Sequence, residues 1–372
     1  MWKIFQEEFR KIASRKIVWI GLFVLLAFVR FRIGEIQNDY SVLIDGETFY
    51  GKEAIEKDKE LTARYAGSLT EEKIREFYEK YGFFYYDADT RERKGNFCSQ
   101  FMTEHLTNFR QIENEETVPE SIVFFEGEEW ERNVGSLLDG TIRFDYAYGW
   151  ENLREVYGIM IVCGLAVLFI IGLSPVFAEE YTLKTADILL TTQRGKKSGI
   201  WMKAAAALCF TVSVYCAVTL YVWGVYLKIF GSQGLDASPE IIWEGLYGYC
   251  PDSIGGFFLF QFGMGLAGLL LLACTVLAVS AMCKNAFLSV IISTILFLFP
   301  AVWLNVLGPM RILGMAMTKV VTLFMVSMPV YLSMHWGFGF QEKQVLMHLA
   351  IAVAVGAGSV ALGYRRYRGY QG

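Results

Sequence analysis

The sequence has few of the side chains with which enzymes build catalytic and metal sites. Its 372 residues include only three histidines, His105, His335 and His348, and these lie far apart in the chain. The motifs His-Glu-x-x-His, Gly-x-Ser-x-Gly and Cys-x-x-Cys are all missing. These absences argue against a zinc or serine hydrolase and against a dithiol oxidoreductase. We expect no catalytic residue, no metal and no cofactor.

A phosphate-binding loop is also missing. The nearest stretch is Gly195-Lys196-Lys197-Ser198, but the glycine that such a loop requires five residues earlier is replaced by Leu190. Lys197 stands where the loop needs serine or threonine. The chain is therefore not expected to bind ATP by itself.

The seven cysteines indicate little, because five of them lie within or beside apolar runs, where cysteine usually acts as a small apolar filler. Cys98 and Cys250 lie outside these runs. A disulfide between them would join two loops, and the spacing alone leaves that pairing open.

Long apolar runs dominate what remains. Hydrophobic residues make up 54% of the chain, and the mean hydropathy is +0.35, which is too apolar for a soluble domain of this length. Five runs lack Asp, Glu, Lys and Arg and approach or exceed the ~20 residues that cross a bilayer. These runs are Val156–Ala178, Ala204–Leu227, Ile254–Met282, Asn285–Met310 and Val345–Tyr364. We predict a polytopic α-helical membrane protein.

A sixth run, Ile17–Val29, is shorter and needs its flanks to cross. Lys16 and Arg30 at its ends can extend toward the headgroups while neighbouring apolar residues lengthen the span. A signal peptide is the alternative, but no small-x-small cleavage site precedes Arg30, which favours an uncleaved anchor. Before it, Trp2, Phe5 and Phe9 follow helical spacing, so 1–16 is predicted to be an interfacial amphipathic helix.

The distribution of Lys and Arg predicts the orientation. With both termini in the cytoplasm, 14 basic residues lie on the cytoplasmic side of the membrane. Six lie on the outer side when those of the large loop are not counted. This arrangement requires an even number of spans, so the Pro-containing stretch 320–341 is interpreted as a re-entrant or interfacial segment. The predicted units are an interfacial helix at 1–16, span 1 at 17–33, an extracellular domain at 34–155, span 2 at 156–178, a cytoplasmic segment at 179–199, span 3 at 200–228, spans 4 and 5 at 254–310, the outer segment at 311–343, span 6 at 344–364 and a cytoplasmic tail at 365–372.

The loop between spans 1 and 2 is domain-sized and acidic. Residues 35–155 hold 28 acidic and 14 basic side chains, and the fold is expected to be mostly helical with an α+β character. A capping box at Ser68 to Glu71 predicts a helix through about Lys80, and a second helix is expected at Ser99–Arg110. Ile122–Phe125 and Thr141–Tyr146 are predicted strands. The acidity fits a solvated surface better than a cation-collecting site around the glutamates of 113–131.

The spans contain no ionisable residue except at their ends, which speaks against a proton-coupled pump. An energy source must then lie in another protein. The charged segment Phe177–Lys197, between spans 2 and 3, is the candidate contact. Read as one helix, it places Glu180, Lys184 and Asp187 on one face and Leu183, Ala186 and Leu190 on another.

This segment resembles the coupling segment in permease subunits of bacterial ATP-binding-cassette exporters of the second type, as found in Gram-positive bacteria. The resemblance rests on Phe177-Ala178-Glu179-Glu180-Tyr181, then Thr185-Ala186-Asp187-Ile188-Leu189-Leu190, then Arg194 and Lys196. The resemblance covers most of the chain, because the predicted six spans with a large outer insertion after the first are also typical of that family. Where that family often has glycine before the threonine, this chain has Lys184.

The resemblance implies a multi-pass permease in a bacterial plasma membrane, driven by a separate ABC-type ATPase. It further implies a second permease, in a homodimer or heterodimer, and contact with membrane lipid but not nucleic acid. The implied coupling residues are Glu179, Glu180, Tyr181, Lys184, Thr185, Asp187, Leu189, Leu190, Arg194 and Lys196. A membrane-anchored sensor that binds an extracellular peptide is the alternative, and the sequence does not identify a substrate.

Overall fold

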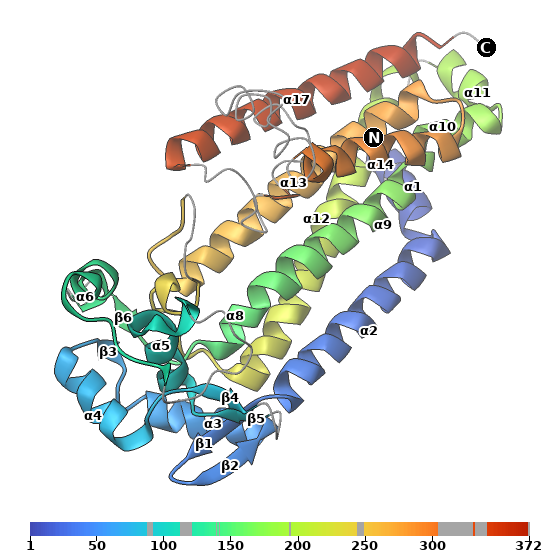
Figure 1. Ribbon diagram of the computed structural model, residues 1–372. Coiled ribbons are helices and arrows are strands. Elements are labelled where there is room, and N and C mark those ends of the chain that lie inside the picture. Colours follow the sequence, from blue (N-terminus) through green and yellow to red (C-terminus); the bar gives the residue numbers. More distant parts are fainter. Residues whose placement is uncertain are drawn as a thin grey trace.

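The computed structural model consists of a bundle of long helices with a small α/β domain at one end (Figure 1). The structure describes residues 1–87, 92–111, 121–138, 140, 142–192, 195–243, 249–303, 330–331 and 341–370. Within this part, five helices are long and apolar enough to cross a membrane, namely Lys16–Asn38, Tyr148–Thr182, Ile200–Phe230, Ile254–Met282 and Glu342–Arg368. This is compatible with a polytopic helical membrane protein.

The bundle helices have the following bounds. They are α1 (Trp2–Ala13), α2 (Lys16–Asn38), α8 (Tyr148–Glu155), a π-helix (Val156–Cys163), α9 (Gly164–Leu173), α10 (Pro175–Thr182), α11 (Thr185–Thr191), a short π-turn (Gly195–Gly199), α12 (Ile200–Phe230), α13 (Ile254–Met282), α14 (Ala286–Val302) and α17 (Glu342–Arg368). Helix α13 is central, because it packs against α17, α12, α9, α10 and α14.

In its described residues, the domain between α2 and α8 is built from short helices and three separate two-stranded antiparallel pairs. Its elements are β1 (Ser41–Ile44), β2 (Glu47–Tyr50), α3 (Gly51–Thr62), β3 (Gly67–Ser68), α4 (Glu71–Tyr81), β4 (Tyr85–Asp87), β5 (Glu92–Lys94), α5 (Phe97–Leu106), a 3₁₀ turn (Asn108–Gln111), α6 (Gly127–Asn133), α7 (Gly135–Leu138) and β6 (Arg143–Phe144). The pairs are β1 with β2, β3 with β6 and β4 with β5. A further 3₁₀ turn (Pro239–Ile241) lies in the α12–α13 loop.

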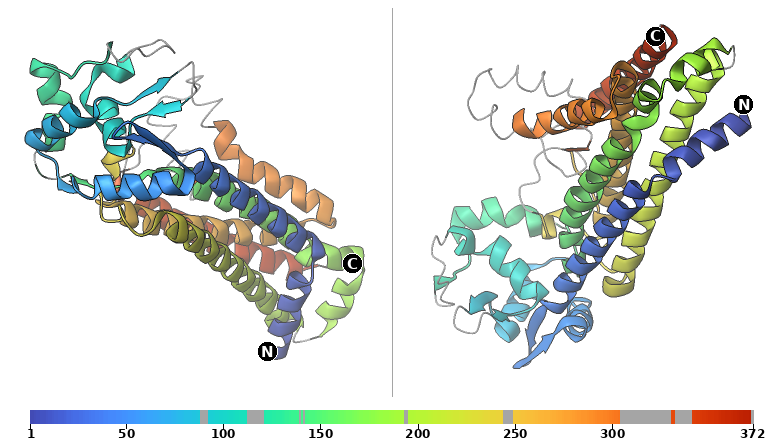
Figure 2. Two further views of the ribbon diagram at one scale, coloured as in Figure 1. Left: turned by 90° about the horizontal axis from the view of Figure 1, so that it is seen from below. Right: turned by 90° about the vertical axis from the view of Figure 1, so that its right-hand side faces the viewer.

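That loop ties the domain to the bundle. The Trp150 indole donates to the carbonyl of Gln233 at 2.7 Å, and the Gln233 amide donates to Asp145 Oδ1 at 2.9 Å. His105 bonds the carbonyl of Glu240 through Nε2 at 3.1 Å. The domain therefore forms a cap at one end of the bundle, and both chain termini lie at the other end (Figure 2).

Several predicted boundaries differ from the structure. Helix α2 continues to Asn38, beyond the predicted end at 33, and the second long helix begins at Tyr148 instead of 156, because polar residues of the loop extend both helices into the domain. Helix α14 is described over 17 apolar residues, and the remainder of the predicted span, from 304 on, lies outside the described part, as do residues up to 329. The predicted outer segment at 311–343 therefore falls almost entirely on residues that the structure does not describe.

Predictions within the domain are partly wrong. Thr70 and not Ser68 caps α4, since the Thr70 hydroxyl accepts from the Lys73 amide. The second helix begins at Phe97 and ends at Leu106, followed by a 3₁₀ turn. The predicted strands reduce to an isolated bridge at Phe124 and to β6. Cys98 and Cys250 are both free thiols.

Candidate functional site

The segment between the second and third long helices folds as two short helices joined by a sharp turn. We call α10, the turn Leu183–Lys184 and α11 the elbow. Lys184 has φ +55° and ψ +21°, the left-handed conformation that ends α10 and redirects the chain into α11. The predicted single helix from Phe177 onward is therefore wrong.

The turn changes which side chains share a face. Ala186 and Leu190 are both buried, in agreement with their predicted place on one apolar face. Leu183, predicted on the same face, is 63% exposed, and Ile188 is 69% exposed. Asp187 is exposed beside them. The elbow thus presents a mixed apolar and acidic surface at the end of the bundle that carries both termini (Figure 1).

Glu180 is buried and bonded within the chain, and its predicted contact with a partner stays a prediction. Its carboxylate pairs with the Lys203 ammonium of α12, and its other oxygen accepts a hydrogen bond from the Tyr367 hydroxyl of α17. Lys203 also pairs with Glu8 of α1 at 3.0 Å. Buried charges are stable only when paired, and this pairing joins α1, α10, α12 and α17.

Glu179 likewise has a partner in the chain. Its Oε2 accepts from Arg15 Nη2 at 2.7 Å, and its side chain remains 49% exposed. Arg15 lies between α1 and α2. The ion pair therefore holds the end of α10 against the start of α2.

The base of the elbow is fixed to α13 by Ser280. Pro175 lies in the first turn of α10, and the amides of Phe177 and Ala178 both donate to Ser280 Oγ, at 3.0 and 3.1 Å. The Ser280 hydroxyl in turn donates to the carbonyl of Ser174 at 2.6 Å. A serine on one helix thereby caps the first turn of another.

The remaining predicted residues have structural contacts or lie outside the described part. The Tyr181 hydroxyl donates to the carbonyl of Ala281 at 2.9 Å, and Thr185 Oγ1 donates to the carbonyl of Glu180 at 3.4 Å. Leu189 is half-buried. Arg194 and the side chain of Lys196 are not described, so their predicted roles stay predictions.

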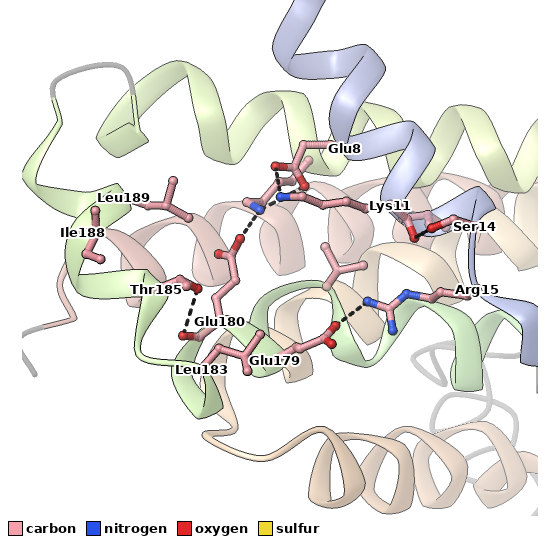
Figure 3. A pocket seen from close by; sticks show the side chains of 13 residues that line it. Glu8, Lys11, Ser14, Arg15, Glu179, Glu180, Leu183, Thr185, Ile188 and Leu189 are labelled. Carbon is pink, nitrogen blue, oxygen red and sulfur yellow. Dashed lines mark hydrogen bonds and ion pairs between the residues drawn. The ribbon is translucent and has the colours of Figure 1, made fainter.

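A cavity of about 640 Å³ opens between α1 and the elbow (Figure 3). Its lining joins charges of both signs with apolar side chains. The lining residues are Glu8, Lys11, Ile12, Ser14, Arg15, Val176, Glu179, Glu180, Leu183, Thr185, Ile188, Leu189 and Lys203. Among the described residues, no group of three or more His, Cys, Asp or Glu side chains is placed to hold a metal ion.

Sequence reasoning missed Glu8, Arg15, Lys203 and Tyr367 as members of this site. One signal was available, because Lys203 is a lysine inside the apolar start of the third long helix and must find an acidic partner there. Which acid it would find depends on the packing of four helices, and the sequence does not show that packing.

Comparison of the chain with protein-family models, with curated proteins and with solved structures finds no match in any of the three. The site is therefore interpreted from its own geometry and chemistry.

Proposed function

We propose that the protein is the membrane-spanning permease subunit of an ATP-driven transporter, with the elbow as the contact for a separate ATPase. The observation that carries this proposal is the exposed surface of Leu183, Asp187 and Ile188, held at the end of two bundle helices by buried ion pairs. Exposed apolar side chains beside a charge are typical of a protein contact.

The connection between the elbow and the spans supports a mechanical role. Tyr148–Thr182 is one 35-residue helical stretch that runs from the small domain to the elbow. Ser280 fixes α10 to α13, while Lys203 fixes it to α12. A displacement of the elbow would therefore move three long helices, because helices that are packed and bonded together move as rigid bodies in a conformational change.

In this proposal the residues take different roles from those first expected. Leu183, Asp187 and Ile188 contact the ATPase, whereas Glu179 and Glu180 position the elbow through Arg15 and Lys203. Export across a bacterial plasma membrane, cytoplasmic termini and a permease dimer belong to the same proposal. They rest on the resemblance and on the distribution of basic residues.

The test uses the full chain purified from its native membrane together with its bound proteins. We expect nucleotide hydrolysis to co-purify with the wild type and to fall about tenfold or more with Asp187→Lys or Ile188→Glu. Glu79→Lys on α4 of the small domain is the matched control, because Glu79 is exposed and lies at the other end of the molecule. It should leave hydrolysis unchanged.

Hydrolysis that is absent from the wild-type preparation, or that is unaffected by both elbow variants, would contradict the proposal. If the elbow variants instead changed only the recruitment of a signalling protein without ATPase activity, the chain would be a membrane-anchored sensor whose small domain binds an extracellular peptide.

A further inference from the structure

Four exposed basic side chains lie at the end of α17 and beside it. Arg365, Arg366 and Arg368 belong to the last turn of this helix, and Lys284 lies in the turn between α13 and α14. We call these four residues the basic cluster. None of them forms an ion pair with a carboxylate of a described residue. An excess of positive charge without such counter-ions attracts anions from outside the chain.

Tyrosine rings place Lys284 beside the end of α17 and orient two of the cations. The Lys284 ammonium lies 5.4 Å from the centre of the Tyr370 ring, which follows the helix. The Arg368 guanidinium lies 5.9 Å from the centre of the Tyr364 ring. Such contacts between a cation and a ring face are attractive. Both basic side chains remain exposed, so an anion from the solvent can reach them.

The basic cluster begins where the apolar part of α17 ends. The run Val345–Tyr364 contains no Asp, Glu, Lys or Arg, and Arg365 follows it directly. Leu362 is 52% exposed, so the flank of the helix next to the cluster is open to lipid. Trp201 at the start of α12 is half-exposed and stacks on Tyr364, with 5.5 Å between the ring centres. Aromatic side chains of this kind are typical of the membrane surface, which places the cluster at the depth of lipid headgroups.

The charge of the cluster selects among headgroups. A zwitterionic headgroup carries a cation beside its phosphate, and four bases without a carboxylate partner among the described residues repel that cation. An anionic headgroup such as phosphatidylglycerol offers the phosphate alone. Arginine binds phosphate oxygens through two parallel N–H groups, and basic segments next to a span are attracted to anionic lipid.

We propose that the basic cluster binds anionic glycerophospholipids through their phosphate groups. The phosphate oxygens accept hydrogen bonds from the three guanidinium groups and from the ammonium, and the acyl chains lie along the exposed flank of α17 at Leu362. The bound lipid holds the end of α17 in the headgroup layer. Tyr367 of the same turn bonds Glu180, so the lipid also steadies the elbow. This inference rests on the membrane position of α17 and not on the proposed ATPase contact.

Native mass spectrometry of the full chain in detergent tests the proposal. Phosphatidylglycerol, phosphatidylethanolamine and phosphatidylcholine, all with palmitoyl and oleoyl chains, are added in equal amounts. We expect the phosphatidylglycerol adduct to be about tenfold more abundant than the phosphatidylcholine adduct, which corresponds to about 1.4 kcal/mol. Phosphatidylethanolamine is also zwitterionic and should behave as phosphatidylcholine does.

Two combined variants separate charge from folding. Replacing Arg365, Arg366 and Arg368 together by Gln should remove most of the preference for phosphatidylglycerol. The three side chains are exposed and make no ion pair with a described residue, so this variant should fold. Replacing the same three residues by Lys keeps the positive charge and should retain most of the preference.

A matched control removes three positive charges from exposed positions on α2, α12 and α17 away from the cluster. It combines Arg30→Gln, Lys228→Gln and Lys343→Gln. These residues lie on three different helices and form no cluster in the sequence of any one of them. The control should therefore keep the preference for phosphatidylglycerol.

Four results would overturn the proposal. They are equal adducts of phosphatidylglycerol and phosphatidylcholine in the wild type, an unchanged preference in the folded Gln variant, and an equal loss of preference in the control. The fourth is binding of soluble glycerophosphoglycerol as tight as that of the lipid, which would assign the cluster to a soluble phosphate compound. If the Gln variant kept its lipid preference but lost a co-purified ATPase, the cluster would be a protein contact instead.

Discussion

Lys184 carries the backbone conformation that makes the elbow. A left-handed conformation costs a non-glycine residue roughly 1–2 kcal/mol, so Lys184→Gly should keep the turn and raise the free energy of unfolding by up to ~1 kcal/mol. Lys184→Val, with a branched β-carbon, should lower it by more. Thermal unfolding in detergent measures both. A Lys184→Gly protein clearly less stable than the wild type would show that the lysine side chain itself stabilises the elbow.

Lys203 pairs with the buried Glu180 and with Glu8, which also pairs with Lys11. Lys203→Met should lower the free energy of unfolding by about 3–5 kcal/mol, because Glu8 and Glu180 lose their shared cation. Adding Glu180→Gln to Lys203→Met should recover part of this loss. A double-mutant cycle by thermal unfolding measures the coupling, and strictly additive effects would contradict the ion pair.

Asp58 in the small domain gives the protein a pH-dependent stability. It is fully buried, accepts from the Tyr40 hydroxyl and from the Phe97 amide, and burial raises the pKa of its carboxyl from 3.8 to about 6. The folded state therefore holds this proton more tightly than the unfolded chain. This contribution to stability is present below about pH 4 and is lost as the pH rises to about 6, at roughly 1.4 kcal/mol for each unit of pKa difference.

The melting temperature between pH 4 and 7 checks this expectation. Asp58→Asn should flatten the part of the profile below pH 6, whereas Asp45→Asn, at an exposed carboxyl, should leave it unchanged. Profiles of wild type and Asp58→Asn with the same slope would contradict the assignment.

At the level of single residues, the sequence did not predict the contacts that the elbow makes within the chain. Glu180 was expected to face a partner because its neighbours are charged and helical spacing placed it with Lys184 and Asp187. Its burial follows from Lys203 and Tyr367, which lie 23 and 187 positions away in the chain. Contacts between residues so far apart in the chain cannot be predicted from a local sequence pattern.

The joint between α10 and α13 is the element on which the proposed transmission depends. Ser280→Ala removes the acceptor of two amides and should lower the free energy of unfolding by about 1–3 kcal/mol. Ser289→Ala on α14 is the matched control, because Ser289 Oγ is buried but has no hydrogen-bond partner among the described residues. It should have little effect. Equal losses in the two variants would show that the Ser280 bonds do not stabilise the joint.

For whole elements, hydropathy predicted well wherever one long apolar run makes one helix. Ile254–Met282 matches its prediction at both ends. Prediction failed where polar residues continue a helix, as in α2 to Asn38, and where a turn divides it, as at Lys184. Lysine is a good helix former, so the residue type at position 184 did not by itself indicate the left-handed turn.

On the scale of the molecule, the structure separates two chemical regions. The acidic domain lies at one end of the long helices, and both termini and the elbow lie at the other (Figure 2). The distribution of basic residues assigns the elbow end to the cytoplasm, and that orientation stays a prediction. Under it, the cytoplasmic ATPase would reach Leu183 and Ile188 without contacting the small domain.

Photo-crosslinking from position 188 in living membranes tests the central claim most directly. Ile188 is replaced by a benzophenone amino acid, and the crosslinked chain is identified by mass spectrometry, with Glu79 on the small domain as the control position. The account predicts a crosslink from position 188 to a nucleotide hydrolase and none from position 79. Crosslinks from position 188 to lipid alone, or to a protein outside the cell, would contradict it.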